Sequence, residues 1–530
     1  MRLFKLHMQS PADSKLGSQP YNELLSSSTS STKRHYSKLF SVATKALSDT
    51  EASGACTIYA LPFELVTQIF DYALDPSQPL FMAVSLSQVS TEWRTIMLRS
   101  PLYWTSIVLD FDIYLYNLNR SPFYRRWTTK FWEELLARSG DLPLTVTVTG
   151  SLGGWKRGSS PPQKEFPRNS EAVLEAIAVH TSRWRDVYLR TTDPNEVYTK
   201  LDVMGVKFNN MRFLDMTCEN NGRHQYNDIC PSFLKRSPGL ETAIIPSDVY
   251  LLRSDLHQGI YIPALRHLVF ERQQIAAFSV ITGLMPHLTS LKINQLTLST
   301  PDSLSYAYIA FTSTPSLLRS LTINFIPREA EEILGQELTI QNLPRLDQLY
   351  LHCEECPQSS LFGPLNNNVQ SSLFIQQLCR FFRGQNNAAM KAQCAGLKTL
   401  DIQSVVRSPN ALHNFLLSLP PSLTSLDIGE AKKRHNDDGL SIFDRESFNL
   451  LSGQDGQVLP ALKRLWISVD VVKLGRDKAL VNMLKARCRS GCDVELDLER
   501  VQWLLQRKDS LDIQAKFISA EGPGQVVLMW

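Results

Sequence analysis

A short apolar motif of the form L-x-x-L-x-[LIF] recurs along this chain, and it limits the possible folds more than any other feature of the sequence. The clear copies begin at residues 265, 288, 318, 346, 397, 423 and 462, and weaker copies begin at 184, 211, 240 and 493. Segments with helical spacing, such as 171–184 and 410–419, lie between copies, and 142–148 is typical of an early strand of the same array. Most neighbouring copies start 23 to 31 residues apart, so the sequence predicts one strand and one helix per repeat.

This alternation predicts the α/β fold of an irregular leucine-rich-repeat solenoid, with parallel strands on the concave face and helices outside. The leucines of each strand should point into the core and the residues between them should point out, because side chains alternate along a strand. One repeat cannot cover its own apolar face, so stacked neighbours must cover it. The repeats are irregular because inserts widen the spacing after residues 346 and 423, and the Asn or Cys that usually follows the strand is mostly absent.

The outward positions of the strands are candidates for binding a target protein. The residues between the last two apolar positions of the strong copies include Lys292, Tyr350, Asp401, Asp427 and Trp466. Aromatic residues dominate the energetics of many interfaces, so Tyr350 and Trp466 could anchor a partner. Asp401 and Asp427 come from adjacent copies and would suit a basic group. The alternative is that these residues are ordinary solvated strand surface.

Composition divides the chain into three parts. Residues 1–57 are polar and rich in serine, and we expect disorder there because such a segment buries too little apolar area to offset chain entropy. Residues 58–104 contain three short helical segments, and residues 105–530 contain the repeats. A chain of 530 residues is also too long for one compact core of ordinary size.

The first helical segment, "LPFELVTQIFDYALDP" at 61–76, is more apolar than a single buried face requires. Pro62 suits the first helical turn, where its missing N–H costs nothing, and Asp75-Pro76 ends the helix. Three helices in so short a stretch make only a weak core. This segment therefore predicts a unit that packs against a partner.

Residues 58–104 resemble an F-box. The resemblance is carried by "LPFELVTQIF", "LSQVSTEWRTI" and "PLYW", with a longer spacer than usual across 73–85. The sequence that follows, which includes "LLARSGDLPLTVTV" and "HTSRWRDVYL", is similar to that of F-box proteins of mushroom-forming fungi.

The resemblance implies that the helices pack on each other with one face and on a Skp-type adaptor with the other. That adaptor would link the chain to a cullin–RING ubiquitin ligase. The adaptor contacts implied by the resemblance are Leu61, Pro62, Ile69, Phe70, Val89 and Trp93. The alternative is that these residues only fill a local helical core.

Charge and composition narrow the possible partners and sites. A net charge of +3, from 55 basic and 52 acidic residues, gives no field that would attract nucleic acid or an anionic membrane. No apolar run is long enough to span a membrane. Nine cysteines without a secretory signal predict reduced thiols in the cytoplasm and/or the nucleus.

The chain lacks the common nucleotide-binding, zinc-protease and hydrolase motifs, so we expect no catalysis and no cofactor. We also expect no metal, because a structural zinc ion needs four ligands that meet in space. His352, Cys353 and Cys356 offer three, and the next pair of thiols lies far along the array.

These features together predict a substrate-recognition subunit of a Skp–cullin–F-box E3 ubiquitin ligase. The F-box would dock on the adaptor, and the repeat domain would recruit an unidentified protein target. Two alternatives stay open. The chain could bind the adaptor but work outside a ligase, or it could be a leucine-rich-repeat scaffold whose three helices only shield the end of the array.

Overall fold

The chain forms two compact units, Met1–Ile96 and Met97–Trp530, in the computed structural model. The structure describes residues 61–73, 79–111, 129–150, 166–191, 194–217, 234, 236–247, 262–274, 285–297, 317–325, 343, 345–353, 376, 378–379, 382, 396–403, 405–406, 408–429, 442–453, 458–469, 478–498 and 525–527. The predicted disorder of residues 1–57 therefore lies outside the described residues. No described helix is both long and apolar enough to cross a bilayer.

The described part of the first unit is helical. Helix α2 spans Phe63–Ala73, α3 spans Pro79–Leu86, and α4 begins at Thr91 and ends at Arg99. Ser90 caps α4, since its hydroxyl accepts the backbone N–H of Trp93 at 3.1 Å. Phe70 lies almost fully buried and meets the ring of Trp93 edge-on, with the ring centroids 4.8 Å apart. This aromatic pair joins α2 to α4.

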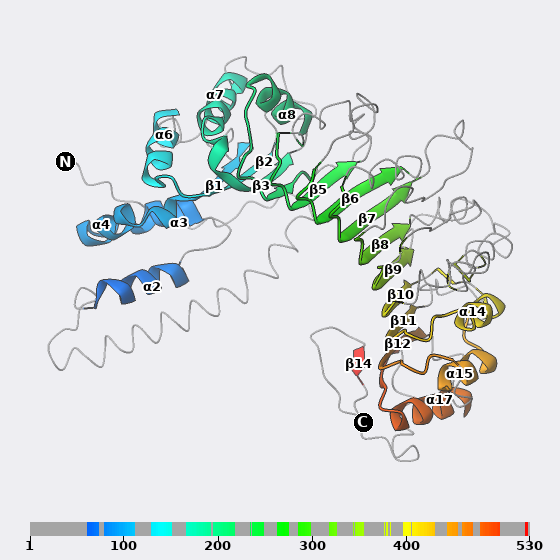
Figure 1. Cartoon of the computed structure of the whole chain (residues 1–530). Coiled ribbons are helices and arrows are strands. Elements are labelled where there is room, and N and C mark those ends of the chain that lie inside the picture. Colours follow the sequence, from blue (N-terminus) through cyan, green and yellow to red (C-terminus); the bar gives the residue numbers. More distant parts are fainter. Residues whose placement is uncertain are drawn as a thin grey trace, which may run out of the picture. The chain divides into compact units, whose positions relative to one another are not determined.

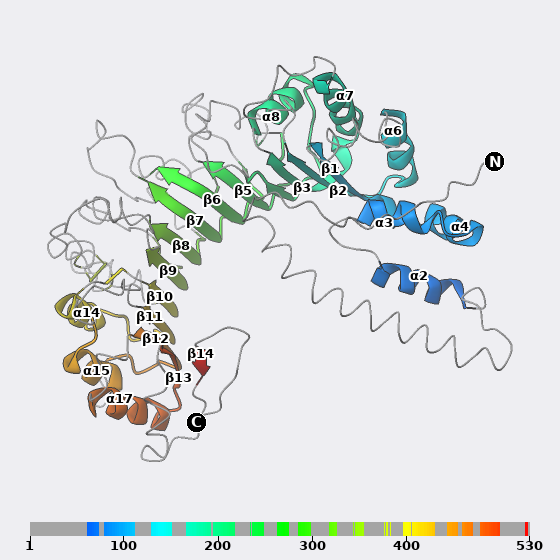
Figure 2. The ribbon, with the colours of Figure 1, turned by 180° about the vertical axis from the view of Figure 1, so that it is seen from behind.

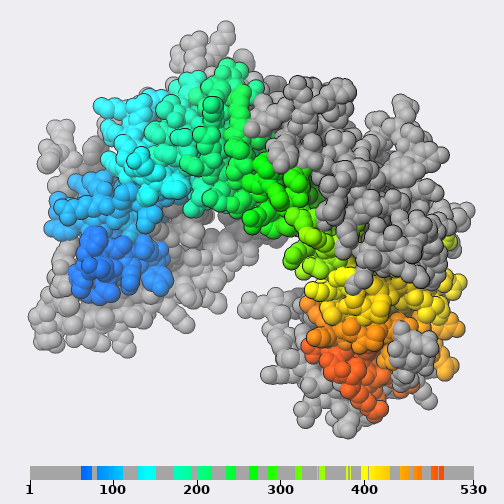
Figure 3. All heavy atoms as spheres, in the orientation of Figure 1, coloured from blue at the N-terminus to red at the C-terminus, as the bar shows by residue number. Residues whose placement is uncertain are grey.

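The second unit is built on one sheet whose strands follow the order of the sequence (Figure 1). Its strands are β1 (Ser106–Asp110), β2 (Leu144–Gly150), β3 (Trp184–Thr191), β4 (Phe213–Asp215), β5 (Thr242–Ser247), β6 (His267–Gln274), β7 (Ser290–Thr297), β8 (Ser320–Phe325), β9 (Gln348–Cys353), β10 (Thr399–Gln403), β11 (Ser425–Gly429), β12 (Arg464–Val469), β13 (Asp493–Leu498) and β14 (Gln525–Val527). Strands β1 to β13 pair in parallel, and β14 pairs antiparallel with β13. The space-filling view shows the described residues following one another in sequence order, as expected when each repeat contacts its neighbours (Figure 3).

Every predicted copy of the apolar motif coincides with a strand. The second and third apolar positions of one copy pair with those of the next, as Leu400 and Ile402 pair with Leu426 and Ile428. These side chains are at most 1% exposed, and they form a continuous core along one face of the sheet. The predicted parallel α/β repeat is thus confirmed, while β1 and β14 were not predicted.

A tight turn leads into each strand, and it explains the prolines that precede the motif. The backbone N–H of Leu265 donates to the carbonyl of Ile262 at 3.3 Å, and that of Leu462 donates to Leu459 at the same distance. Pro263 and Pro460 occupy the second position of these four-residue turns. Proline favours this position because its ring fixes φ near the value that the turn requires.

Neighbouring repeats are also joined by a shared carbonyl just before each strand. The carbonyl of Arg266 accepts the N–H groups of Thr289 and Ser290 at 2.8 and 2.9 Å. The same two-donor pattern recurs from Glu241 to Thr424, so each repeat holds the start of the next strand in place. A carbonyl oxygen can accept both donors because it has two lone pairs.

The described helices of the second unit lie on the apolar face of the sheet, on the same side in both views (Figures 1 and 2). They are α6 (Thr129–Arg138), α7 (Phe166–Ala178), α8 (Pro194–Val203), α14 (Pro409–Leu416), α15 (Arg445–Ser452) and α17 (Lys478–Arg489). No described helix of the second unit covers the opposite face, which we call the open face. It corresponds to the surface that the sequence predicted to face a target.

Arginines from later repeats cap the C-terminal ends of helices in earlier ones. The contacts are Arg183 to Leu142 O and Ser139 Oγ beyond α6, Arg236 to Asp202 O in α8, and Arg487 to Leu451 O, Leu459 O and Val458 O around the end of α15. A cation at this end of a helix satisfies carbonyls that lack an intrahelical donor and complements the helix dipole. These three arginines tie their own repeats to the preceding ones.

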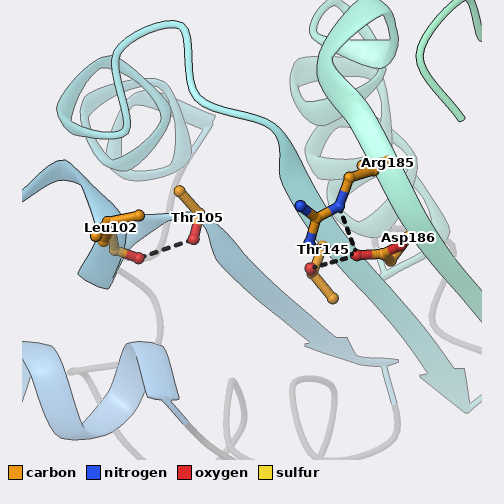
Figure 4. A network of polar contacts seen from close by, with 5 residues as sticks. All are labelled: Leu102, Thr105, Thr145, Arg185 and Asp186. Atoms are coloured by element: carbon orange, nitrogen blue, oxygen red, sulfur yellow. Dashed lines mark hydrogen bonds and ion pairs between the residues drawn. The ribbon is translucent and has the colours of Figure 1, made fainter. Parts of the chain in front are cut away.

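The first strands carry a polar network on the open face (Figure 4). Arg185 Nε donates to Asp186 Oδ2 at 2.9 Å, and Thr145 on the neighbouring strand lies 3.5 Å from the same oxygen. Nearby, the hydroxyl of Thr105 donates to the carbonyl of Leu102 at 2.8 Å. The carboxylate of Asp186 therefore has partners within the chain.

Candidate protein-interaction surfaces

Helix α2 carries two apolar stripes. Val66 and Phe70, one turn apart, face the interior and are 5% and 1% exposed. Leu65, Ile69 and Tyr72 follow the i, i+4, i+7 spacing of a second stripe, and they are 45%, 41% and 80% exposed. We call these three residues the outer stripe. An exposed stripe of this kind on a short helix is typical of a surface that packs on a partner.

The structure separates the six predicted adaptor contacts by burial. Ile69 and Val89 are exposed, at 41% and 60%, and Pro62 is exposed as well. Leu61 and Trp93 are half-buried, while Phe70 lies inside the unit against Trp93. Phe70 therefore fills the interior and is not available to a partner here. The predicted adaptor contacts do not include Leu65 and Tyr72. Their helical spacing from Ile69 would have been enough to place them on the same exposed face.

The five predicted target-binding residues all lie in one row across the open face. Lys292 pairs with Thr322 on the next strand, and Thr322 pairs with Tyr350. The row continues through Asp401, Asp427 and Trp466, each the Cα partner of the one before. Four of the predicted residues thus occupy adjacent strands, while Lys292 lies apart from them beyond β8.

The C-terminal part of this row forms a polar and aromatic group that we call the Asp401 cluster. It consists of Tyr350, His352, Asp401, Asp427 and Trp466. Asp401 is only 7% exposed, although it lies on the open face. His352 Nε2 lies 2.9 Å from its Oδ2, and the ring of His352 meets that of Tyr350 edge-on.

Electrostatics shows that the Asp401 cluster is partly shielded from water. Burial raises the pKa of Tyr350, and the carboxylates of Asp401 and Asp427 raise it further, while Arg464 acts in the opposite direction. The Tyr350 hydroxyl therefore stays protonated at neutral pH and can donate a hydrogen bond. The cluster combines a donor, two carboxylates and two aromatic rings.

A second group on the open face, the Asp215 cluster, lies on β3 and β4. Its members are Tyr188, Arg190, Phe213 and Asp215. Arg190 donates to Asp215 Oδ2 from Nε at 2.9 Å and from Nη2 at 2.7 Å. The guanidinium also lies over the ring of Tyr188, 5.3 Å from its centroid. The sequence did not predict this cluster, because its copies of the motif are weak ones.

The metal site considered from the sequence is not assembled among the described residues. His352 contacts Asp401, Cys353 ends β9, and Cys356 lies outside the described part of the chain. The described residues contain no group of three side chains placed to hold a metal ion. Cys379 and Cys492 are buried cysteines, and burial raises the pKa of the Cys492 thiol.

No protein-family model and no curated protein matches the chain. Among solved structures, the chain is similar to the crystal structure of the leucine-rich repeat-containing protein LegL7 from Legionella pneumophila. The two chains are 11% identical with a TM-score of 0.27, over 85% of this chain and 98% of that chain. A TM-score this low does not establish a common fold. The parallel repeat architecture of this chain therefore rests on its own strand order, register and burial.

Proposed function

We propose that this chain is a non-catalytic substrate receptor of a Skp–cullin–F-box ubiquitin ligase. In this proposal the first unit docks on a Skp-type adaptor and the sheet-bearing unit recruits a protein target. The chain would act by proximity, because holding a target near a charged ubiquitin carrier raises the effective concentration of its lysines. Such a receptor works in the cytoplasm and/or the nucleus and needs no cofactor of its own.

The outer stripe of α2 is the observation that carries the proposal. Three large apolar side chains on one face of an eleven-residue helix stay exposed, while the neighbouring stripe packs inside. This is the two-sided helix that the F-box resemblance implies. Exposed apolar area of this kind favours binding, since burying it releases about 25 cal/mol for each Å² removed from water.

Substitutions on α2 test the adaptor contact. Ile69→Asp places a charge in the centre of the outer stripe, and we expect it to reduce retention of a co-expressed Skp-type adaptor in a pulldown by at least tenfold. Asp71→Lys is the control, because it also changes the charge of an exposed residue on the same helix, but Asp71 is two positions from Ile69 and so faces away from the centre of the stripe. The control should retain the adaptor as well as the unaltered chain does.

The proposal fails if Ile69→Asp binds the adaptor normally, or if neither protein binds it. A chain beginning at Met97, where the second unit begins, should also lose the adaptor. Ubiquitination of a captured target in a reconstituted reaction would then separate a ligase receptor from an F-box protein that works outside a ligase.

The second candidate function is a protein-binding scaffold that uses no adaptor. The observation that favours it is the open face, which carries the Asp215 cluster on β3 and β4 and the Asp401 cluster on β9 to β12 of one repeat sheet. Sheets of stacked repeats present extended binding surfaces of this kind. A scaffold would bind its target equally well with the first unit removed and would not bring it to a ligase.

A further inference from the structure

The same arrangement of three side chains occurs twice on the open face. In each case a tyrosine and an aspartate are Cα partners on adjacent strands, and a nitrogen-bearing residue two positions after the tyrosine reaches the aspartate. The two sets are Tyr188, Arg190 and Asp215 on β3 and β4, and Tyr350, His352 and Asp401 on β9 and β10. The Asp215 cluster therefore serves as an internal reference for the Asp401 cluster.

In the reference set, Tyr188, Arg190 and Asp215, the aspartate carboxylate has all the hydrogen-bond donors it needs. Both oxygens of the buried Asp215 carboxylate have donors: Oδ2 accepts two hydrogen bonds from Arg190, and Oδ1 accepts the backbone N–H of Thr217 at 3.0 Å. The forked guanidinium supplies charge and two donors at once, and it lies over the ring of Tyr188. A buried carboxylate is stable when it is paired and hydrogen-bonded in this way.

In the second set, Tyr350, His352 and Asp401, one oxygen of the aspartate carboxylate lacks a hydrogen-bond donor among the described residues. Asp401 Oδ2 has His352 Nε2 at 2.9 Å and a long contact from Gln403 Nε2 at 3.4 Å. Its Oδ1 is buried and accepts no hydrogen bond from any described residue. Asp427, at the paired position on β11, adds a second carboxylate beside it. Leaving a buried carboxylate oxygen without a donor is unfavourable, and a like charge next to it adds to the cost.

The charged groups that face the cluster do not remove this excess. Among the described side chains they are Asp401 and Asp427, which are acidic, and Arg464 on β12, which is basic. Two carboxylates and one guanidinium leave an excess of one negative charge among these three. The missing element is therefore a cation that brings more than one N–H donor.

We infer that the Asp401 cluster binds the guanidinium group of an arginine side chain on a protein target. The target's arginine would donate to Asp401 Oδ1, the oxygen whose counterpart in Asp215 is satisfied by the backbone N–H of Thr217. It would also bring the positive charge that Arg190 brings to Asp215, with its plane against Tyr350 or Trp466. Arginine fits better than lysine because its fork presents two parallel donors to a carboxylate and stacks on aromatic faces. The inference rests on the proposed use of the open face for target binding, and it is independent of the adaptor.

Two aromatic residues flank the carboxylates of Asp401 and Asp427 in the row, and either could pack against the bound guanidinium. Tyr350 and Trp466 are three strands apart, which is roughly 14 Å at a strand spacing of about 4.8 Å. Gly429 lies between Gln403 and Trp466, and a Cβ atom there would lie 3.5 Å from a side-chain atom of each. The Trp466 ring thus lies close to Gly429 on β11, the strand that carries Asp427. Binding requires Gln403, whose contact is long, to move aside from Asp401.

Fluorine NMR on the full-length chain tests this inference directly. The nine tryptophans would be replaced biosynthetically by 5-fluorotryptophan, and Trp466→Phe would identify the resonance of Trp466. The probe is the peptide acetyl-Gly-Arg-Gly-amide, compared with the same peptide containing citrulline, which has arginine's shape without its charge. We expect a saturable shift of the Trp466 resonance with the arginine peptide and at least tenfold weaker binding of the citrulline peptide.

Three variants locate the binding. Asp401→Asn should weaken binding of the arginine peptide at least tenfold, whereas Asp186→Asn, a carboxylate on the same open face, should leave it unchanged. His352→Arg places a guanidinium beside Asp401 Oδ2, as Arg190 lies beside Asp215 Oδ2, and so supplies positive charge to the cluster from within the chain. It should therefore raise the midpoint of thermal unfolding while it weakens peptide binding at least tenfold. A variant that gains stability and loses binding cannot be dismissed as misfolded.

Equal binding of the arginine and citrulline peptides would overturn the inference, as would unchanged binding in His352→Arg. If the matching lysine peptide bound more tightly, the inferred preference for a guanidinium over an ammonium group would be wrong. These results do not depend on the adaptor pulldown. A chain that binds arginine but no adaptor would refute the ligase proposal alone, and a chain that binds adaptor but no arginine would refute this inference alone.

Discussion

At the scale of single residues, Arg487 shows how a buried charge can be accommodated by backbone carbonyls. The residue is 4% exposed and donates to the carbonyls of Leu451, Val458 and Leu459. Burial lowers the pKa of its guanidinium, but arginine starts from so high a value that it stays charged at neutral pH. The carbonyl dipoles at the end of α15 supply the stabilisation that a carboxylate would otherwise give.

Arg487→Met should therefore destabilise the chain, because methionine fills part of the volume but removes the hydrogen bonds that the guanidinium donates to the carbonyls of Leu451, Val458 and Leu459. We expect the free energy of unfolding to fall by about 2–4 kcal/mol, measured by urea denaturation. Arg489→Met is the control, since Arg489 ends the same helix and is exposed; its effect should stay within about 0.5 kcal/mol. Equal effects in the two variants would contradict this account of the Arg487 contacts.

At the scale of elements, the ends of the helices differ in how tightly they are packed. Gly453 caps α15 and Gly205 follows α8, both with positive φ, at 66° and 62°. A Cβ atom at Gly453 would lie 3.1 Å from the guanidinium of Arg487, whereas one at Gly205 would meet nothing within 4 Å. Glycine is therefore favoured at 205 only by its positive φ, whereas at 453 it is favoured both by its positive φ and by the lack of space for a side chain.

The two glycines separate these causes experimentally. Gly205→Ala should cost about 1 kcal/mol, the ordinary penalty for an L-residue in the left-handed region. Gly453→Ala should cost measurably more, because the added methyl group also displaces Arg487 from the carbonyls. Comparing the two by thermal unfolding checks the difference, and equal losses would mean that the Arg487 side chain yields without cost.

The elements also show what sequence reasoning could find. The strand–helix alternation was predictable because the apolar motif has period two on the strand and recurs along the chain. The row from Tyr350 to Trp466 followed from the same period. The pairing of His352 with Asp401 was not predictable, because the sequence does not say which outward side chains on different strands meet. Phe70 was assigned outward because a helix with two apolar stripes does not reveal from sequence which one faces in.

At the scale of the whole sheet, stability should be local. Each strand pairs with its neighbours in sequence, so a defect in one repeat is felt most by the adjacent ones. Phe448 is fully buried in α15 and stacks on Phe443 with ring centroids 5.5 Å apart. It lies between β11 and β12 in sequence and far from β2 and β3.

Phe448→Ala should consequently have a graded effect along the sheet. Removing the ring typically costs about 3–5 kcal/mol in a core. We expect hydrogen exchange, followed by mass spectrometry, to speed up strongly in β11–β13 and little in β2–β3. An equal increase in every strand would show that the unit unfolds as a single cooperative block.

The constant register of the strands has a consequence for how such a chain can change. The connection between β9 and β10, from 354 to 398, is much longer than that between β10 and β11, yet Tyr350 still pairs with Asp401 as Asp401 pairs with Asp427. Length added on the connecting side is therefore not transmitted to the opposite side. Evolution or a protein engineer can lengthen or replace the connections without moving the rows of the open face, and can rewrite those rows one position at a time without disturbing the core.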